Sequence, residues 1–155
     1  MIVVKNDRIQ AYIDINPELY KTVTEDFPYF IAHEYRRFYE LLDNKQYFGA
    51  YFEMKDVLEV LLKFPILLGT AYIDKLCTDE GQDCLKELLR KQMSLGDWAS
   101  YGNSIAKKLK KDQQVRPLYR ALKDILGIYG SENVVRWRNT RIGHGAVAGD
   151  IMQYV

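Results

Sequence analysis

The sequence predicts an all-α protein built as a helical bundle of five to six helices. Apolar residues recur every three or four positions through most of the chain, which is the spacing that places side chains on one face of a helix. Prolines, glycines and small polar residues interrupt this pattern at intervals that suit short turns. The 155 residues, 48% of them hydrophobic, are enough for one buried core, so we expect a single domain over 1–155.

The beginning of the chain differs from the helical remainder. Residues 2–4 and 9–13 flank Asn6 and Asp7, and this pattern predicts a small N-terminal β-hairpin. The first helix is expected to begin at Pro28, whose missing N–H costs nothing in a first turn, and to end before Gly49. Its apolar face comprises Ile31, Tyr35, Phe38 and Leu42.

The second predicted helix covers residues 51–76 and is the most apolar segment of the chain. Leu58, Leu61 and Leu68 share its stripe, and Pro65 should kink or break it because proline cannot donate to the carbonyl of Leu61. A third helix is expected to start at Thr78 as its cap and to end near Met93. Its inward-facing residues are predicted to be Leu85, Leu88 and Leu89.

Three further helices are expected in the last third of the chain. The fourth helix is capped by either Ser94 or Asp97. The fifth helix begins at Pro117 and ends at Gly130. The sixth helix is capped by Ser131 and ends between Arg141 and Gly143. The fourth helix ends in a basic run, which is either a solvated face that suits the helix dipole or an RNA contact. This run contains Lys107, Lys108, Lys110 and Lys111.

The composition excludes several functional classes. Twenty-two basic against 21 acidic residues give a net charge of only +1, so any contact with nucleic acid or a membrane must be local. The cysteines, Cys77 and Cys84, lack metal or redox spacing and are expected to be reduced and buried. We expect no metal and no cofactor. Without a secretory signal or a long uncharged apolar segment, we expect a cytoplasmic protein with no membrane association.

One short segment concentrates polar functional groups. Residues 136–144 contain three arginines, one asparagine and one of the two histidines. Arg138 and His144 would lie about 120° apart on an unbroken helix, but a helix that ends at Gly143 allows His144 to turn back toward Arg138 and Asn139. The same histidine could instead cap the last carbonyls of the helix, which is a purely structural role.

This segment resembles the signature of the HEPN (higher eukaryotes and prokaryotes nucleotide-binding) superfamily. That signature is an arginine, usually followed by a polar residue, with a histidine after four to six intervening residues; here it reads Arg138, Asn139 and, after five intervening residues, His144. Residues 49–61 are similar to the long core helix of bacterial members, and residues 94–98 are similar to a turn in such proteins. The resemblance covers about residues 49 to 147.

The resemblance implies a metal-independent endoribonuclease of the bacterial defence or toxin kind, acting on RNA as a homodimer. It implies that Arg138, Asn139 and His144 are the catalytic residues. Arg136 and Arg141, with Lys107 and Lys108, are then secondary RNA-binding candidates, although solvated helix-end charges are an alternative explanation for them. An antitoxin is a second possible partner.

Two alternatives stay open. The first is a non-catalytic HEPN module that dimerises or binds a nucleotide or partner, which the near-neutral charge favours. The second is that the chain is the N-terminal part of a longer protein with a further domain, because the apolar end at residues 151–155 is unusual for a terminus.

Overall fold

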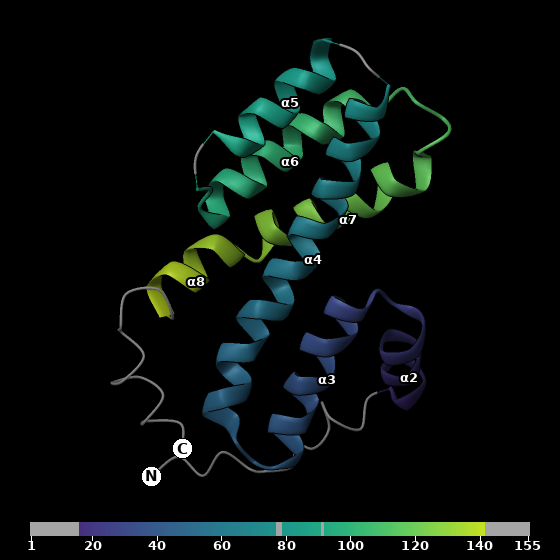
Figure 1. Ribbon diagram of the computed structural model, residues 1–155. Coiled ribbons are helices and arrows are strands. Elements are labelled where there is room, and N and C mark those ends of the chain that lie inside the picture. The colour runs from purple at the N-terminus through teal and green to yellow at the C-terminus, as the bar shows by residue number, and fades with distance from the viewer. Residues whose placement is uncertain (1–15, 77–78, 91, 142–155) are drawn as a thin grey trace. The chain divides into compact units, whose positions relative to one another are not determined.

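The computed structural model describes residues 16–76, 79–90 and 92–141. Within these ranges the chain forms seven α-helices and no strand, which confirms the all-α prediction but adds at least one helix to the expected five or six (Figure 1). The β-hairpin expected near the N-terminus falls in residues 1–15 and lies outside the described residues.

The helices belong to two units, and the long helix α4 contributes to both. The first unit is Met1–Val60 with Arg138–Val155, and the second is Leu61–Trp137. The single domain expected over 1–155 stays a prediction. The helices are α2 (Pro17–Asp26), α3 (Tyr29–Asp43), α4 (Tyr47–Lys75), α5 (Asp79–Leu89), α6 (Leu95–Leu109), α7 (Arg116–Ser131) and α8 (Val134–Arg141).

Helix α2 was missed by the sequence interpretation although its start carries ordinary signals. The side chain of Asn16 accepts a hydrogen bond from the backbone N–H of Leu19 at 2.9 Å, and Pro17 occupies the first turn. Helix α2 packs on α3, where the ring of Tyr20 lies with its centroid 5.2 Å from that of Tyr39. This aromatic contact anchors a short polar helix that has few other buried residues.

The turn between α3 and α4 differs from the prediction. Gly49 was expected to separate the two helices, but it lies inside α4, two residues after Tyr47. The chain reverses instead at Lys45, whose φ of 57° is in the left-handed region. A lysine in this conformation has no sequence signal comparable to a glycine, which explains the error.

Helix α4 is continuous across Pro65, so of the two predicted outcomes, a kink or a break, the break is wrong. Proline in a helix interior costs about 3 kcal/mol. Leu62 and Ile66, on either side of it, are completely buried, and full burial of such side chains contributes about 1.5–3 kcal/mol each. Burial therefore offsets the lost hydrogen bond. The buried face continues through Thr70, whereas Leu68, expected in the core, is exposed.

The second unit is built around α4, α5 and α6. Among the described side chains of α5, Cys84 is buried and forms no disulfide, as predicted, whereas Leu85 and Leu89 are exposed and their predicted inward orientation is wrong. The hydroxyl of Tyr101 in α6 donates to the backbone oxygen of Cys84 at 2.9 Å and lies 3.0 Å from Thr70 Oγ1. This buried polar contact links the three helices.

The ends of α6, α7 and α8 follow the predictions in part. Ser94 caps α6 in a full capping box with Asp97, as one of the two predicted alternatives. The predicted cap of the last helix, Ser131, is wrong because Ser131 still belongs to α7. Helix α8 begins at Val134 after Asn133, whose φ of 52° is a conformation that asparagine tolerates well.

Two glycines allow α6 to approach its neighbours closely. A Cβ at Gly69 in α4 would lie 2.6 Å from Ile105 Cγ2, and a Cβ at Gly102 in α6 would lie 2.7 Å from Ile66 Cδ1. Ile105 is completely buried, and its Cγ2 is attached directly to Cβ, so this methyl group cannot move away without a backbone shift. Gly69 is therefore required by packing.

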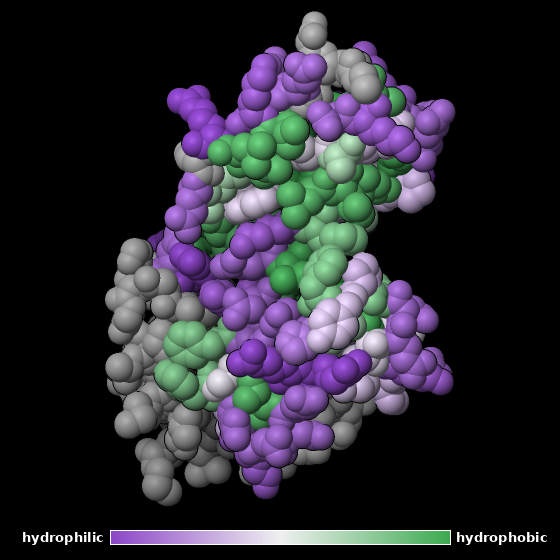
Figure 2. Space-filling model, in the orientation of Figure 1, coloured by the Kyte–Doolittle hydropathy of each residue, from purple (hydrophilic) through white to green (hydrophobic). Residues whose placement is uncertain are grey.

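Large apolar side chains are also exposed on the second unit, among them Leu67, Leu76 and Ile128, and Figure 2 shows apolar surface on this unit. No helix in the described part of the chain combines the length and the apolar character needed to cross a bilayer.

We expect Gly69→Ala to destabilise the protein. Crowding against the rigid Ile105 methyl group should cost up to about 3 kcal/mol, which outweighs the gain of about 1 kcal/mol in helix propensity, so the free energy of unfolding should fall by up to about 2 kcal/mol. The matched control is Gly127→Ala in α7, where an added Cβ meets no atom within 4 Å and should raise stability by up to about 1 kcal/mol. Urea unfolding measures both, and equal changes would contradict the close packing.

Candidate functional site

The predicted catalytic segment begins on α8, the last described helix. Val134 is buried at its start, and the backbone N–H of Trp137 donates to the oxygen of Asn133 at 2.9 Å, which joins the helix to its left-handed entry residue. Arg138 and Asn139 are adjacent residues within this helix. Their backbone positions are therefore set by regular helical geometry and not by a loop.

Arg138 and Asn139 contact each other directly. Nη1 of Arg138 donates a hydrogen bond to Oδ1 of Asn139 at 3.1 Å. Because adjacent residues on a helix point about 100° apart, this bond requires the long arginine side chain to lie across the helix surface toward its neighbour. The contact leaves the amide nitrogen of Asn139 directed away from the guanidinium as a potential donor.

Glu59 in α4 holds the other edge of the guanidinium. Nε of Arg138 lies 3.8 Å from Oε1 of Glu59, which is an ion pair but too long for a hydrogen bond. Nε is buried and has no hydrogen-bond acceptor among the described residues, while 34% of the Arg138 side chain is exposed. The guanidinium is thus fixed by charge attraction and one hydrogen bond.

This arrangement leaves part of the guanidinium for another anion. No acceptor for Nη2 of Arg138 occurs among the described residues. A planar guanidinium with free N–H donors can hold two oxygens of one phosphate group or carboxylate. A bound phosphate would compete with Glu59 for the same positive charge.

The described part of the chain contains only some of the other predicted site residues. His144 lies outside the described residues, and so does the side chain of Arg141, so the expected approach of His144 to Arg138 stays a prediction. Arg136, Lys107 and Lys108 are exposed, the first on α8 and the two lysines on α6. His33 is also exposed and stacks on Tyr29 with ring centroids 5.6 Å apart.

The described residues contain no group of three or more His, Cys, Asp or Glu side chains placed to hold a metal ion.

The structure adds a buried carboxyl group that the sequence interpretation did not single out. Glu53 in α4 is only 4% exposed, and its Oε2 accepts from Nε of the exposed Arg37 at 3.0 Å. Its other oxygen, Oε1, is buried without a hydrogen-bond partner among the described residues. Glu53 follows Ala50 by three positions, so the burial of Ala50 on the same face was the available signal.

The surroundings of Glu53 disfavour its ionised form. The pKa of Glu53 is raised to about 7, mainly by burial and also by the neighbouring carboxyl group of Glu34, while Arg37 opposes the shift. Asp56 contributes a smaller repulsion. Glu53 therefore gains or loses a proton near neutral pH, which is a property of groups at functional sites as well as of some structural carboxyl pairs.

Comparison of the chain with family models, curated proteins and solved structures found no match.

We expect Glu53 to make stability depend on pH. Its pKa is raised from 4.5 to about 7 by folding, so the folded state binds more protons than the unfolded state between these values, and stability falls as the pH rises through this window. Glu53→Gln, which copies the protonated form, should therefore gain roughly 1–3 kcal/mol relative to wild type between pH 5 and pH 8.

Denaturant unfolding at several pH values measures this difference. Glu40→Gln, which neutralises an exposed carboxylate of α3, is the matched control. An unchanged difference between wild type and Glu53→Gln across the range would contradict the assigned proton.

Proposed function

We propose that this protein is a metal-independent endoribonuclease of the HEPN type, with Arg138, Asn139 and His144 as its catalytic residues. The observation that supports the proposal is the pair formed by Arg138 and Asn139 on α8, in which the guanidinium is held at two edges and the arginine side chain is one-third exposed. A fixed, accessible guanidinium is what binding of a phosphodiester requires. His144 follows this pair in the sequence at the spacing typical of the HEPN signature.

In the proposed reaction His144 acts on protons and Arg138 acts on charge. An imidazole accepts the proton of the ribose 2′-hydroxyl, the 2′-oxygen forms a bond to phosphorus, and the bond from phosphorus to the 5′-oxygen breaks. The leaving 5′-oxygen takes a proton from an imidazolium, so the products are a 2′,3′-cyclic phosphate and a 5′-hydroxyl. Arg138 opposes the charge that grows on the phosphoryl oxygens, and Asn139 orients the phosphate.

A homodimer would supply two such sites facing one substrate. One imidazole could then serve as the base and the other as the acid, as the HEPN resemblance implies. RNA cleavage in bacterial defence or as a toxin, in the cytoplasm, is the corresponding biological role, and an antitoxin or a further domain would then restrain it.

The ion pair between Arg138 and Glu59 favours a second candidate function. A guanidinium that already has a carboxylate partner, with a buried Nε, also suits a purely structural arginine in a non-catalytic HEPN module. Such a module would dimerise or bind a nucleotide or partner protein. It predicts no RNA cleavage at any protein concentration.

Replacing His144 with alanine should abolish cleavage. Loss of a general acid or base lowers rates by about 10²- to 10⁴-fold, and loss of a group that stabilises developing charge lowers them by about 10²- to 10³-fold. We therefore expect His144→Ala and Arg138→Ala to reduce cleavage of a fluorescent single-stranded RNA by these factors, with activity of the wild type unaffected by EDTA. Mass spectrometry should identify the 2′,3′-cyclic phosphate.

Two matched variants control for unspecific effects. His33→Ala removes the other histidine, and Arg120→Ala removes an exposed arginine of α7; both should cleave at the wild-type rate. Circular dichroism establishes that each variant is folded. Cleavage by His144→Ala at the wild-type rate would refute the nuclease assignment, and absence of cleavage by the wild type would favour the non-catalytic module.

A further inference from the structure

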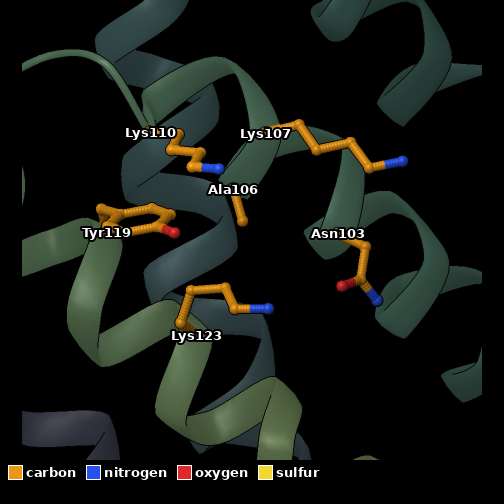
Figure 3. Close-up of a pocket in the computed structure, with 6 residues that line it drawn as sticks. All are labelled: Asn103, Ala106, Lys107, Lys110, Tyr119 and Lys123. Carbon is orange, nitrogen blue, oxygen red and sulfur yellow. The ribbon is translucent and has the colours of Figure 1, made fainter.

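A pocket of about 160 Å³ in the second unit is lined mainly by basic and polar side chains. Its residues come from α6 and the position after it, and from α7, and these two helices pack against each other. Figure 3 shows them as sticks: Asn103, Ala106, Lys107, Lys110, Tyr119 and Lys123.

Helical spacing explains why these residues converge. Asn103, Lys107 and Lys110 follow one another at intervals of four and three positions, which places them on one face at the end of α6. Tyr119 and Lys123 are four positions apart on α7 and therefore share a face as well. Ala106 is buried, and its small side chain leaves the open space between the two faces.

The side chains around this space are directed so that several donors meet. In Figure 3 the ammonium groups of Lys110 and Lys123 and the hydroxyl group of Tyr119 point toward the space beside Ala106, while the side chain of Lys107, which also lines the pocket, extends away from that space. The amide of Asn103 donates to the backbone oxygen of Ala99 at 3.0 Å, which fixes its orientation.

The lysines of this pocket have no ion-pair partner in the part of the chain that the structure describes. Asp112, which follows the basic run, accepts instead from the hydroxyl of Tyr72 at 2.7 Å and from the backbone N–H of Gln114 at 2.9 Å. The ammonium groups of Lys110 and Lys123, which point into one small space, repel each other, and a bound anion would relieve this repulsion.

Helix-end electrostatics accounts for only part of this cluster. Lysines are favoured at the negative end of a helix, which explains Lys107 and Lys110 at the end of α6. Lys123 lies in the middle of α7 and gains nothing from that effect, yet it points into the same space as Lys110. The convergence of cations from two helices therefore requires a different explanation.

We propose that this pocket binds a terminal phosphate or polyphosphate group, as found on a nucleotide or at the 5′ end of an RNA. Sites for whole drug-sized ligands measure about 300–1,000 Å³, so this pocket holds one or two phosphate groups with the rest of the ligand outside. A phosphate monoester carries close to two negative charges and matches the two ammonium groups of Lys110 and Lys123 better than a singly charged phosphodiester does. Tyr119 and Asn103 supply neutral hydrogen bonds.

This site is independent of the proposed nuclease site. It includes Lys107 from the predicted RNA contacts, but none of Arg138, Asn139 and His144. Binding can therefore be measured in a His144→Ala background, in which RNA is not consumed, and a failed nuclease proposal would leave the pocket untouched.

Calorimetric titration with sodium tripolyphosphate tests the pocket directly. Wild type should bind tripolyphosphate, and the double variant Lys110→Gln with Lys123→Gln should bind it at least tenfold more weakly. The matched control is Lys86→Gln with Lys111→Gln, which removes the same charge from exposed positions of the second unit outside the pocket and should change the affinity less than twofold. Absence of binding to wild type, or equal losses in both double variants, would overturn the proposal.

Two further probes identify the source of the phosphate. If ATP binds to the wild type and the Lys110/Lys123 double variant does not bind ATP, the ligand is a nucleotide. If a 5′-triphosphate RNA binds His144→Ala more tightly than the same RNA with a 5′-hydroxyl, and the double variant removes this difference, the ligand is an RNA end. Either result supports the proposed pocket. The proposal would be refuted if the double variant bound tripolyphosphate, ATP and both RNAs as tightly as the control variant does.

Discussion

The close approach of α6 to α4 at Gly69 is the constraint on which the second unit depends. Ile105 fits against Gly69 only because that position has no side chain, and Gly102 in turn admits Ile66 and Leu126. These contacts fix α6 against α4 and bring α7 against α6. The lysine pocket is a consequence, because its two faces meet only when α6 and α7 hold this distance. Packing at two glycines thus determines where exposed lysines converge.

Much of the helical fold could be predicted because burial and capping act locally. The period of apolar residues and the cap at Ser94 identified α6 correctly, since both signals lie within the helix itself. The errors arise where tertiary contacts determine whether a helix continues or which of its faces is buried. Pro65 remains inside α4 because its neighbours Leu62 and Ile66 are buried, and Leu89 is exposed because α5 buries Cys84 instead. No local pattern specifies these outcomes.

The candidate sites were less predictable than the helices, for the same reason. Sequence spacing identified Arg138 and Asn139 as neighbours, but it could not predict that Glu59, 79 positions earlier, would hold the guanidinium. The buried Glu53 was recognisable only as a polar residue on an otherwise apolar face. The pocket requires Lys110 and Lys123 from separate helical segments, and no sequence pattern distinguishes Lys123 from other surface lysines.

Local charge, more than net charge, determines what this protein can bind. With 22 basic and 21 acidic residues the chain has almost no long-range field, and at physiological salt charges are screened beyond about 8 Å. An anion at Arg138 or in the lysine pocket would therefore respond only to the groups that surround it. Arg138 offers one guanidinium already shared with Glu59, whereas the pocket offers the ammonium groups of Lys110 and Lys123, which have no carboxylate partner among the described residues. A singly charged phosphodiester suits the first environment, and a terminal phosphate with close to two negative charges suits the second.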